Sequence, residues 1–242
     1  MDNPMYRERT YRNHVSTPGL EIFRVTVRET DLFITAQRNL TSEALRSIER
    51  HRTLIENYIK LSADFLSSLT PLPNDKQAPD IVQKMLSAGI AARVGPMAAV
   101  AGAMAEFVGR DLLKCSSEII VENGGDIYLS CRRDITIGIF AGKSPLSNRI
   151  TLKIDPEQMP LGVCTSSGTV GPSLSFGKAD AVCVLASSST LADAAASHIG
   201  NQIKTKKDIR KALQSGARIP GVTGMVIIID DHMGAWGAVT LI

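Results

Sequence analysis

The first third of the chain has the hydrophobic pattern of a β-hairpin followed by a long helix. Apolar and polar residues alternate between positions 20 and 36, and a polar interruption within this stretch predicts the turn between two strands. From Thr41 or Ser42, either of which is a suitable N-cap, apolar residues recur at helical spacing as far as Leu69. Pro71 ends this predicted helix.

The helical pattern resumes over residues 80–113. It is interrupted at Gly95-Pro96, because a proline ring cannot continue the interior of a helix. The stretch 94–105 is rich in alanine and glycine and is shorter than the roughly 20 apolar residues that a membrane span needs. We therefore expect a buried helix here and no association with a membrane.

The rest of the chain changes to short apolar runs, which are typical of strands, with helices between them. The predicted strands are residues 118–121, 127–131, 135–140, 150–154 and 181–185. One helix is expected from Thr190 to about Ile203 and another over residues 206–215. Residues 222–241 are predicted to form a closing hairpin.

This order of elements separates runs of strands by runs of helices. It predicts an α+β fold with largely antiparallel sheets and packed helices. We expect a single domain over residues 1–242. Its halves, about 20–131 and 132–242, are candidates for a structural duplication, although no repeat of individual residues connects them.

Composition argues against several classes of function. The 242 residues are 44% hydrophobic and 21% charged, as in an ordinary globular protein. A net charge of +3 is too small to indicate binding to nucleic acid, and no cluster of Lys and Arg is interleaved with aromatic residues. The four cysteines show no C-x-x-C spacing, so we expect free thiols in a reducing compartment, the cytoplasm.

A glycine turn between two predicted strands is the first segment that could bind a ligand. It consists of Asn123, Gly124, Gly125 and Asp126. The two glycines permit positive φ and let a ligand approach the backbone closely, and the flanking side chains can bind a hydroxyl or an amide. Asn-Gly is equally a signal for a simple hairpin turn, which is the simpler explanation of this segment alone.

A run of hydroxyl residues is the second such segment. Thr165, Ser166 and Ser167 precede Gly168, and successive backbone N–H groups and hydroxyls in such a loop can bind a phosphate. A solvated loop is the simpler alternative for this run alone. Cys164 directly precedes the run and is the candidate catalytic thiol, although a buried structural cysteine is the commoner case.

A carboxylate and a hydroxyl on one helical face form the third segment. Asp193 and Ser197 are four residues apart, so their side chains lie on the same face of the predicted helix. Together they could supply two oxygen ligands to Mg²⁺, which favours hard oxygen donors and ligand phosphates. Alternatively Asp193, three residues after Thr190, completes a capping box and Ser197 only packs.

The histidines are not assigned to this candidate site. His51 lies on a charged helix and is interpreted as solvated. His198 adjoins Ser197 but points about 100° away around the helix. No Ser, His and Asp arrangement typical of a hydrolase is recognisable in the sequence.

Taken in order, the three segments resemble the motif series of the ApbE-like superfamily, the fold family of the FAD:protein FMN transferases. Its members carry a G-G-D-I turn, a T-S-G segment and an A-D-A-x-x-T helix start, which correspond here to residues 124–127, 165–168 and 192–197. The resemblance implies a duplicated T-fold-like α+β architecture and FAD or FMN as the cofactor. It also implies that Asp193 and Ser197 bind a divalent metal, Mg²⁺; serine in place of the usual threonine keeps the oxygen.

One element of the flavin transferases is missing. Residues 169–180 lie where those enzymes carry an H-x-x-D-P-x-T-G element, and they do not reproduce it. The usual Lys-Gly pair of the small-residue helix is also replaced, by residues 98–102. We therefore expect no FMN transfer to an acceptor peptide. Residues 95–99 and 175–181 mark a separate branch of the superfamily.

Three functions remain open at the level of sequence. The first is Mg²⁺-dependent binding of a flavin nucleotide or related phosphate-containing ligand, with residues 123–126 and 165–168 lining the pocket. The second is a non-flavin accessory protein of sulfur or cofactor metabolism, which works through Cys164 or a partner enzyme. The third is a structural homologue with an empty site. A homodimer is expected only by analogy with other T-fold proteins.

Overall fold

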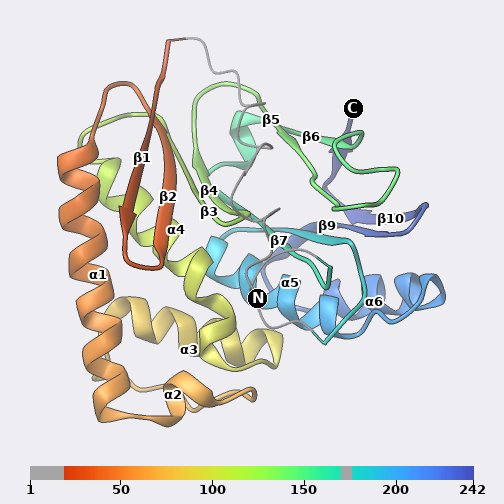
Figure 1. The fold of residues 1–242 in the computed structure, drawn as a ribbon, viewed down its shortest axis with the longest axis horizontal. Coiled ribbons are helices and arrows are strands. Elements are labelled where there is room, and N and C mark those ends of the chain that lie inside the picture. Colours follow the sequence, from red (N-terminus) through yellow and green to blue (C-terminus); the bar gives the residue numbers. More distant parts are fainter. Residues whose placement is uncertain (1–18, 170–175) are drawn as a thin grey trace.

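An eight-stranded antiparallel sheet organises the computed structural model, which describes residues 19–169 and 176–242 (Figure 1). The strands follow the order β1-β2-β3-β4-β7-β8-β9-β10, and each pairs antiparallel with its neighbour. Their bounds are β1 Glu21–Val27, β2 Thr30–Ala36, β3 Ile119–Asn123, β4 Asp126–Ser130, β7 Leu161–Ser166, β8 Ala181–Ala186, β9 Val222–Ile229 and β10 His232–Gly237.

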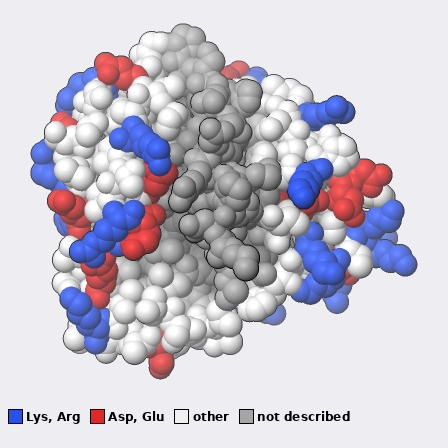
Figure 2. All heavy atoms as spheres, viewed as in Figure 1, with Lys and Arg blue, Asp and Glu red and all other residues white. Residues whose placement is uncertain are grey.

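Helices cover one face of this sheet, with α1 beside β1 and β2 at one end and α6 beside β9 and β10 at the other (Figure 1). The helices are α1 Thr41–Leu61, α2 Asp64–Ser67, α3 Asp80–Ala92, α4 Val100–Leu112, α5 Ser189–Asn201 and α6 Ile209–Gly216. The described residues also form the short 3-10 helices η3 Pro96–Ala99, η4 Pro156–Gln158 and η5 Lys206–Asp208. Charged side chains of both signs are interspersed over the α1 edge of the face in Figure 2.

A small sheet of three strands packs on the opposite face. It consists of β5 Ile135–Gly138, β6 Thr151–Ile154 and β11 Thr240–Leu241. The alternation of side chains along β3 divides the core between the two faces. Ile119 and Val121 belong to the cluster under the helices, whereas Ile120 packs with Leu152 of the small sheet. Residues of one strand thus serve two separate cores.

The predicted α+β fold with antiparallel sheets is confirmed, and so are the hairpin at 20–36 and the break at Gly95-Pro96. Around that break α3 and the segment Pro96–Leu112 are bent by 104°. A hairpin, helices and a second hairpin follow one another twice along the chain, in β1 to β4 and again in β7 to β10. The division into halves at about 20–131 and 132–242 stays a prediction.

The first long helix was predicted with the wrong ends. Helix α1 ends at Leu61 because Ser62 leaves the helical conformation, with φ −137° and ψ 88°. The leucines at 66 and 69 continued the helical spacing, but their side chains are 55% and 60% exposed and contribute little to the core. At the other end the N-cap is Leu40, which makes no side-chain cap, rather than Thr41 or Ser42.

The apolar stretch after residue 80 was predicted to be a buried helix rather than a membrane span. Among residues 19–169 and 176–242, no single helix is long and apolar enough to do so. The pair Asp80–Ala92 and Pro96–Leu112 meets the criteria of length and composition only when its two bent parts are taken together.

Candidate functional site

Strand pairing brings the glycine turn beside the hydroxyl run. In the register of β4 with β7, Asp126 lies opposite Cys164, and the backbone N–H of Thr165 donates to the carbonyl oxygen of Gly125 at 3.2 Å. Gly124 and Gly125 have φ of 68° and 105°, as the glycine pair predicted. The turn is also a true hairpin turn between β3 and β4, so the simpler explanation of this segment describes its backbone correctly.

The hydroxyl run is only partly a loop, contrary to the prediction. Thr165 and Ser166 are the last residues of strand β7, which the pattern of apolar residues did not reveal. Gly168 donates its N–H to the carbonyl oxygen of Ala179 at 2.9 Å. Ser167 Oγ accepts from the N–H of Thr169 at 3.1 Å. The N–H of Gly168 is therefore already engaged. An anion at the loop predicted for 165–168 would have to be bound by other N–H groups or by the hydroxyls.

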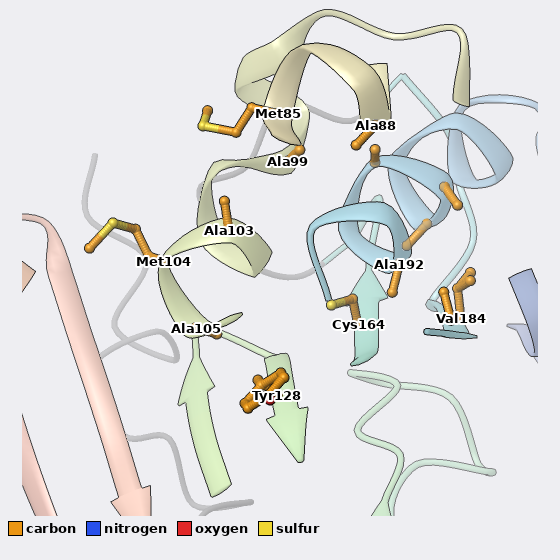
Figure 3. Packing of buried hydrophobic residues seen from close by; sticks show 14 of the residues in the cluster. Met85, Ala88, Ala99, Ala103, Met104, Ala105, Tyr128, Cys164, Val184 and Ala192 are labelled. Carbon is orange, nitrogen blue, oxygen red and sulfur yellow. The ribbon is translucent and has the colours of Figure 1, made fainter. Parts of the chain in front are cut away.

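Helix α5 is set directly on β7. Its N-cap is Ser188, whose Oγ accepts from the N–H of Leu191, and not Thr190 as the sequence indicated. Cys164 Sγ donates to the carbonyl oxygen of Ser189 at 3.3 Å. Figure 3 shows Cys164 in the same buried cluster as Ala192 of α5. The first turn of α5 therefore lies over the strand that carries the hydroxyl run.

This close approach depends on a glycine. A Cβ atom at Gly162 would lie 2.3 Å from Cα of Ser189 and 2.4 Å from its backbone nitrogen. We expect Gly162→Ala to lower the free energy of unfolding by about 1–3 kcal/mol, because backbone rather than a flexible side chain must move. Gly138→Ala in β5 is the matched control, since a Cβ there meets nothing within 4 Å. Urea unfolding of both variants tests this, and equal stability of the two would contradict it.

Asp193 reaches from α5 to the beginning of α4. Its Oδ2 accepts from the backbone N–H of Gly102 at 2.8 Å, and Gly102 is the third residue of α4, whose own N-cap supplies no side-chain bond. A carboxylate at this position satisfies a free N–H and interacts favourably with the positive end of the helix dipole. The alternative of a capping box with Thr190 is wrong, because Asp193 is the fifth residue of α5 and caps a different helix.

A buried glutamate, missed by the sequence analysis, fixes the start of α5 in the same manner. Glu106 of α4 is 5% exposed, and its Oε2 accepts from Ser188 Oγ at 2.6 Å and from Thr190 Oγ1 at 2.9 Å. It also accepts from the N–H of Thr190 at 3.2 Å. The feature of the sequence that could have revealed this residue is a single glutamate in a helix of small apolar residues. Helices α4 and α5 thus cap each other.

The side chain of Asn123 joins the glycine turn to this junction. Its Nδ2 donates to the carbonyl oxygen of Ala101 at 3.1 Å, next to the residue that binds Asp193. Strand β3, helix α4 and helix α5 therefore meet at one point. The structure brings Asn123, Asp126 and Asp193 together there, as the order of the motifs predicted.

Two carboxyl groups with raised pKa values lie at this meeting point. Burial raises the pKa of Asp193 to about 7, although hydrogen bonds from the backbone of Gly102 and Ala101 oppose the shift. Burial and the negative charge of Asp193 raise the pKa of Asp126 well above its ordinary range, against a hydrogen bond from Cys164. Within the described residues neither carboxylate forms an ion pair. The raised pKa values express the cost of placing two negative charges together in this poorly solvated place.

The donor set fits a hard divalent cation. Asp193 and Ser197 are partly buried on one side of α5, one turn apart, and both offer oxygen. A cation there would also neutralise the charges of Asp126 and Asp193. No three His, Cys, Asp or Glu side chains in the described ranges are grouped as metal ligands. The remaining ligands would therefore come from a bound ligand, from backbone carbonyls or from water.

Cys164 lies beside these carboxylates but has the environment of an unreactive thiol. Its side chain is fully buried. Burial and the nearby charges of Asp126 and Asp193 raise the pKa of the Cys164 thiol well above its ordinary value. Reactive cysteines need the opposite, an accessible and electropositive environment that stabilises the thiolate. The structure therefore argues against nucleophilic chemistry or sulfur transfer at Cys164.

The segment in which the H-x-x-D-P-x-T-G element is missing lies partly outside the described residues, at 170–175. Its ends are fixed. Thr169 Oγ1 donates to Asp180 Oδ1 at 3.1 Å, and the N–H of Lys178 donates to the carbonyl oxygen of Ile203 at 2.8 Å. Asp180 also accepts from the N–H of Asp230 at 2.7 Å. These contacts place both ends of the segment against the region of α5 and β9.

Comparison with known proteins identifies relatives along nearly the whole chain. A family model described as "AbpE bacteria" matches residues 12–236. A UPF0280 protein of Methanosarcina acetivorans is 36% identical over 239 residues, covering 98% of this chain and 93% of the relative. A UPF0280 protein of Methanococcus aeolicus is 42% identical, over 81% of this chain and 81% of its own length. A UPF0280 protein of Methanocaldococcus jannaschii is 38% identical, over 89% of this chain and 90% of its own length.

Solved structures with the same fold include a protein named as a flavin transferase and one named only as an ApbE protein. The H257G mutant of the flavin transferase ApbE from Vibrio cholerae matches with a TM-score of 0.57 and 13% identity, over 90% of this chain and 97% of that one. The ApbE protein of Thermotoga maritima matches with a TM-score of 0.52 and 13% identity, over 89% and 96% of the two chains. The chain belongs to the ApbE-like superfamily, within the family described as AbpE bacteria.

Proposed function

We propose that this protein binds a flavin nucleotide, or a related ligand that contains phosphate, together with Mg²⁺ at the junction of β3, β4, α4 and α5. The observation that carries the proposal is the pair of neighbouring carboxyl groups, Asp126 buried and Asp193 partly buried, with no ion-pair partner among the described residues. A divalent cation supplies the missing positive charge. The fold, shared with structures of the flavin transferase ApbE from Vibrio cholerae, supports a flavin as the organic part.

Each segment of the junction has a separate task in this proposal. Asp193 and Ser197 hold the cation, which would polarise and neutralise the ligand phosphates when bound. The positive φ of Gly124 and Gly125 leaves the backbone open to close approach by the ligand. Residues 165–168 contribute hydroxyls from Thr165 and Ser166, at the end of β7. Asn123 and Glu106 orient helices α4 and α5.

FMN transfer is not part of the proposal. The sequence lacks the H-x-x-D-P-x-T-G element, and the buried thiol of Cys164 does not replace it as a reactive group. Binding without transfer would suit a protein that stores, delivers or senses a flavin nucleotide. The four cysteines are unpaired in the structure, which supports the reducing cytoplasm as the compartment.

Titration with FAD tests the proposal directly. Flavin fluorescence is followed as the purified protein is added, once with Mg²⁺ and once with EDTA. We expect saturable quenching in Mg²⁺ and at least tenfold weaker binding in EDTA. Mass spectrometry of an acceptor peptide incubated in the same mixture is expected to detect no covalent flavin. Absence of quenching in both buffers, for FAD and for FMN, would contradict flavin binding.

A further inference from the structure

A separate cavity opens between helices α1, α3 and α4. Its volume is about 450 Å³, and its wall includes Arg50, Arg110 and Lys114. The cavity lies between α4 and the helices α1 and α3, whereas Gly102 and Glu106 of α4 contact α5. We propose that this cavity binds a small organic anion, with one phosphate or carboxylate group on an apolar body. The inference does not depend on the flavin site.

An ionised aspartate organises the cationic side of the cavity. Asp111 accepts hydrogen bonds from Ser47 Oγ at 2.7 Å, His51 Nε2 at 2.9 Å, Lys114 Nζ at 3.1 Å and from Arg50. Burial raises the pKa of Asp111, but these four bonds outweigh it and keep the pKa well below its usual range. Asp111 therefore stays charged and holds the heads of Arg50 and Lys114 in place. Positions fixed in this way lower the entropic cost of binding.

His51 shows that the cavity wall is built rather than incidental. The sequence interpreted this residue as solvated, yet its side chain is buried, and its ring meets that of Phe107 edge to face at 5.3 Å. Burial lowers the pKa of His51 despite the opposing effect of Asp111, so the ring is neutral at pH 7. Its Nδ1 has no hydrogen-bond partner among the described residues. Burying a polar nitrogen without a hydrogen-bond partner costs free energy.

Arg110 is the cavity cation that has no counter-ion among the described residues. Its guanidinium lies over the ring of Phe107, 5.4 Å from the centroid, and forms no ion pair with another described residue. Three cations and two acids, Asp80 and Asp111, line the cavity, which gives an excess of one positive charge with His51 neutral. The first turn of α3 also enters the wall, and a helix N-terminus favours an anion.

The remaining wall is apolar, which defines the other half of the ligand. Leu54 of α1, Ile81 of α3 and Phe107 of α4 face the cavity. A volume of about 450 Å³ is within the range of small-molecule sites, roughly 300–1,000 Å³, and is larger than a bare oxyanion requires. An aromatic or aliphatic group attached to the anion would bury these side chains. The cavity therefore matches a ligand with one charged end.

Phenyl phosphate is a suitable probe because it combines one ring with one phosphate. Isothermal titration of the full-length protein is compared with titrations by inorganic phosphate and by benzyl alcohol. We expect measurable binding of phenyl phosphate and at least tenfold weaker binding of either fragment. If inorganic phosphate binds as tightly, the apolar half of the proposal is wrong. If phenyl phosphate does not bind, the whole proposal is wrong.

Three variants assign binding to this cavity. Arg110→Gln removes the unpaired cation and is expected to weaken phenyl phosphate at least tenfold. Arg46→Gln, one turn before Arg50 on α1 but outside the wall, is the matched control and is expected to bind like the wild type. Asp80→Asn removes an opposing charge and is expected to strengthen binding, which a merely structural role would not do. Equal losses in the Arg110 and Arg46 variants, with unchanged melting temperatures, would overturn the assignment.

Discussion

Replacing Asp193 by asparagine is expected to weaken Mg²⁺-dependent binding of FAD at least tenfold, equivalent to about 1.4 kcal/mol or more. The change removes a negatively charged oxygen ligand, and a neutral amide oxygen binds Mg²⁺ poorly. The same amide oxygen can still accept the hydrogen bond from Gly102 N–H. The cap of α4 is therefore retained, and the variant should fold.

The control for this variant is Asp64→Asn, because Asp64 is an exposed acid at the start of α2. It is expected to bind FAD like the wild type. Thermal unfolding of both variants separates binding from folding. A large fall in the melting temperature of Asp193→Asn with unchanged affinity would mean that Asp193 serves only as the cap of α4. Asp193→Ala, which loses the cap as well, should be the least stable of the three.

The elements that could be predicted from the sequence are those whose structure is decided locally. In the hairpin at 20–36, strand β1 alternates because one of its faces is buried, and the turn at 123–126 is decided by its glycines. Strand β7 was missed because its sequence, Leu-Gly-Val-Cys-Thr-Ser, has no alternation. It is an interior strand covered on both faces, and Gly162 is required by contact with α5 rather than by its own strand.

Contacts between distant residues account for the rest. Asp193 and Gly102 are 91 residues apart in sequence, and Ser188 and Glu106 are 82 apart. Local spacing suggested a capping box for Asp193, but the packing of α4 on α5 offered its carboxylate a different helix to cap. His51 was misjudged for a related reason. Its neighbours on α1 are charged, yet its own position faces Phe107, and only the relative placement of two helices determines that.

The stability of the metal-free protein is expected to fall as the pH rises through about 7, and Asp193 is expected to be the cause. The pKa of Asp193 is raised from 3.8 to about 7 in the folded state, so the folded protein binds this proton more tightly than the unfolded chain. The resulting stabilisation is fully present below pH 3.8 and is lost through pH 7. Mg²⁺ favours the ionised carboxylate and should offset the loss.

The comparison that isolates this effect is between wild type and Asp193→Asn in EDTA, by urea unfolding from pH 5 to pH 8. Asparagine does not titrate, so the difference in free energy of unfolding should shift by on the order of 2 kcal/mol in favour of the variant over this range. Asp64→Asn should retain the pH dependence of the wild type. Parallel pH profiles for wild type and Asp193→Asn would mean that Asp193 is already ionised at pH 5. Asp193 would then need no cation to carry its charge in the folded protein.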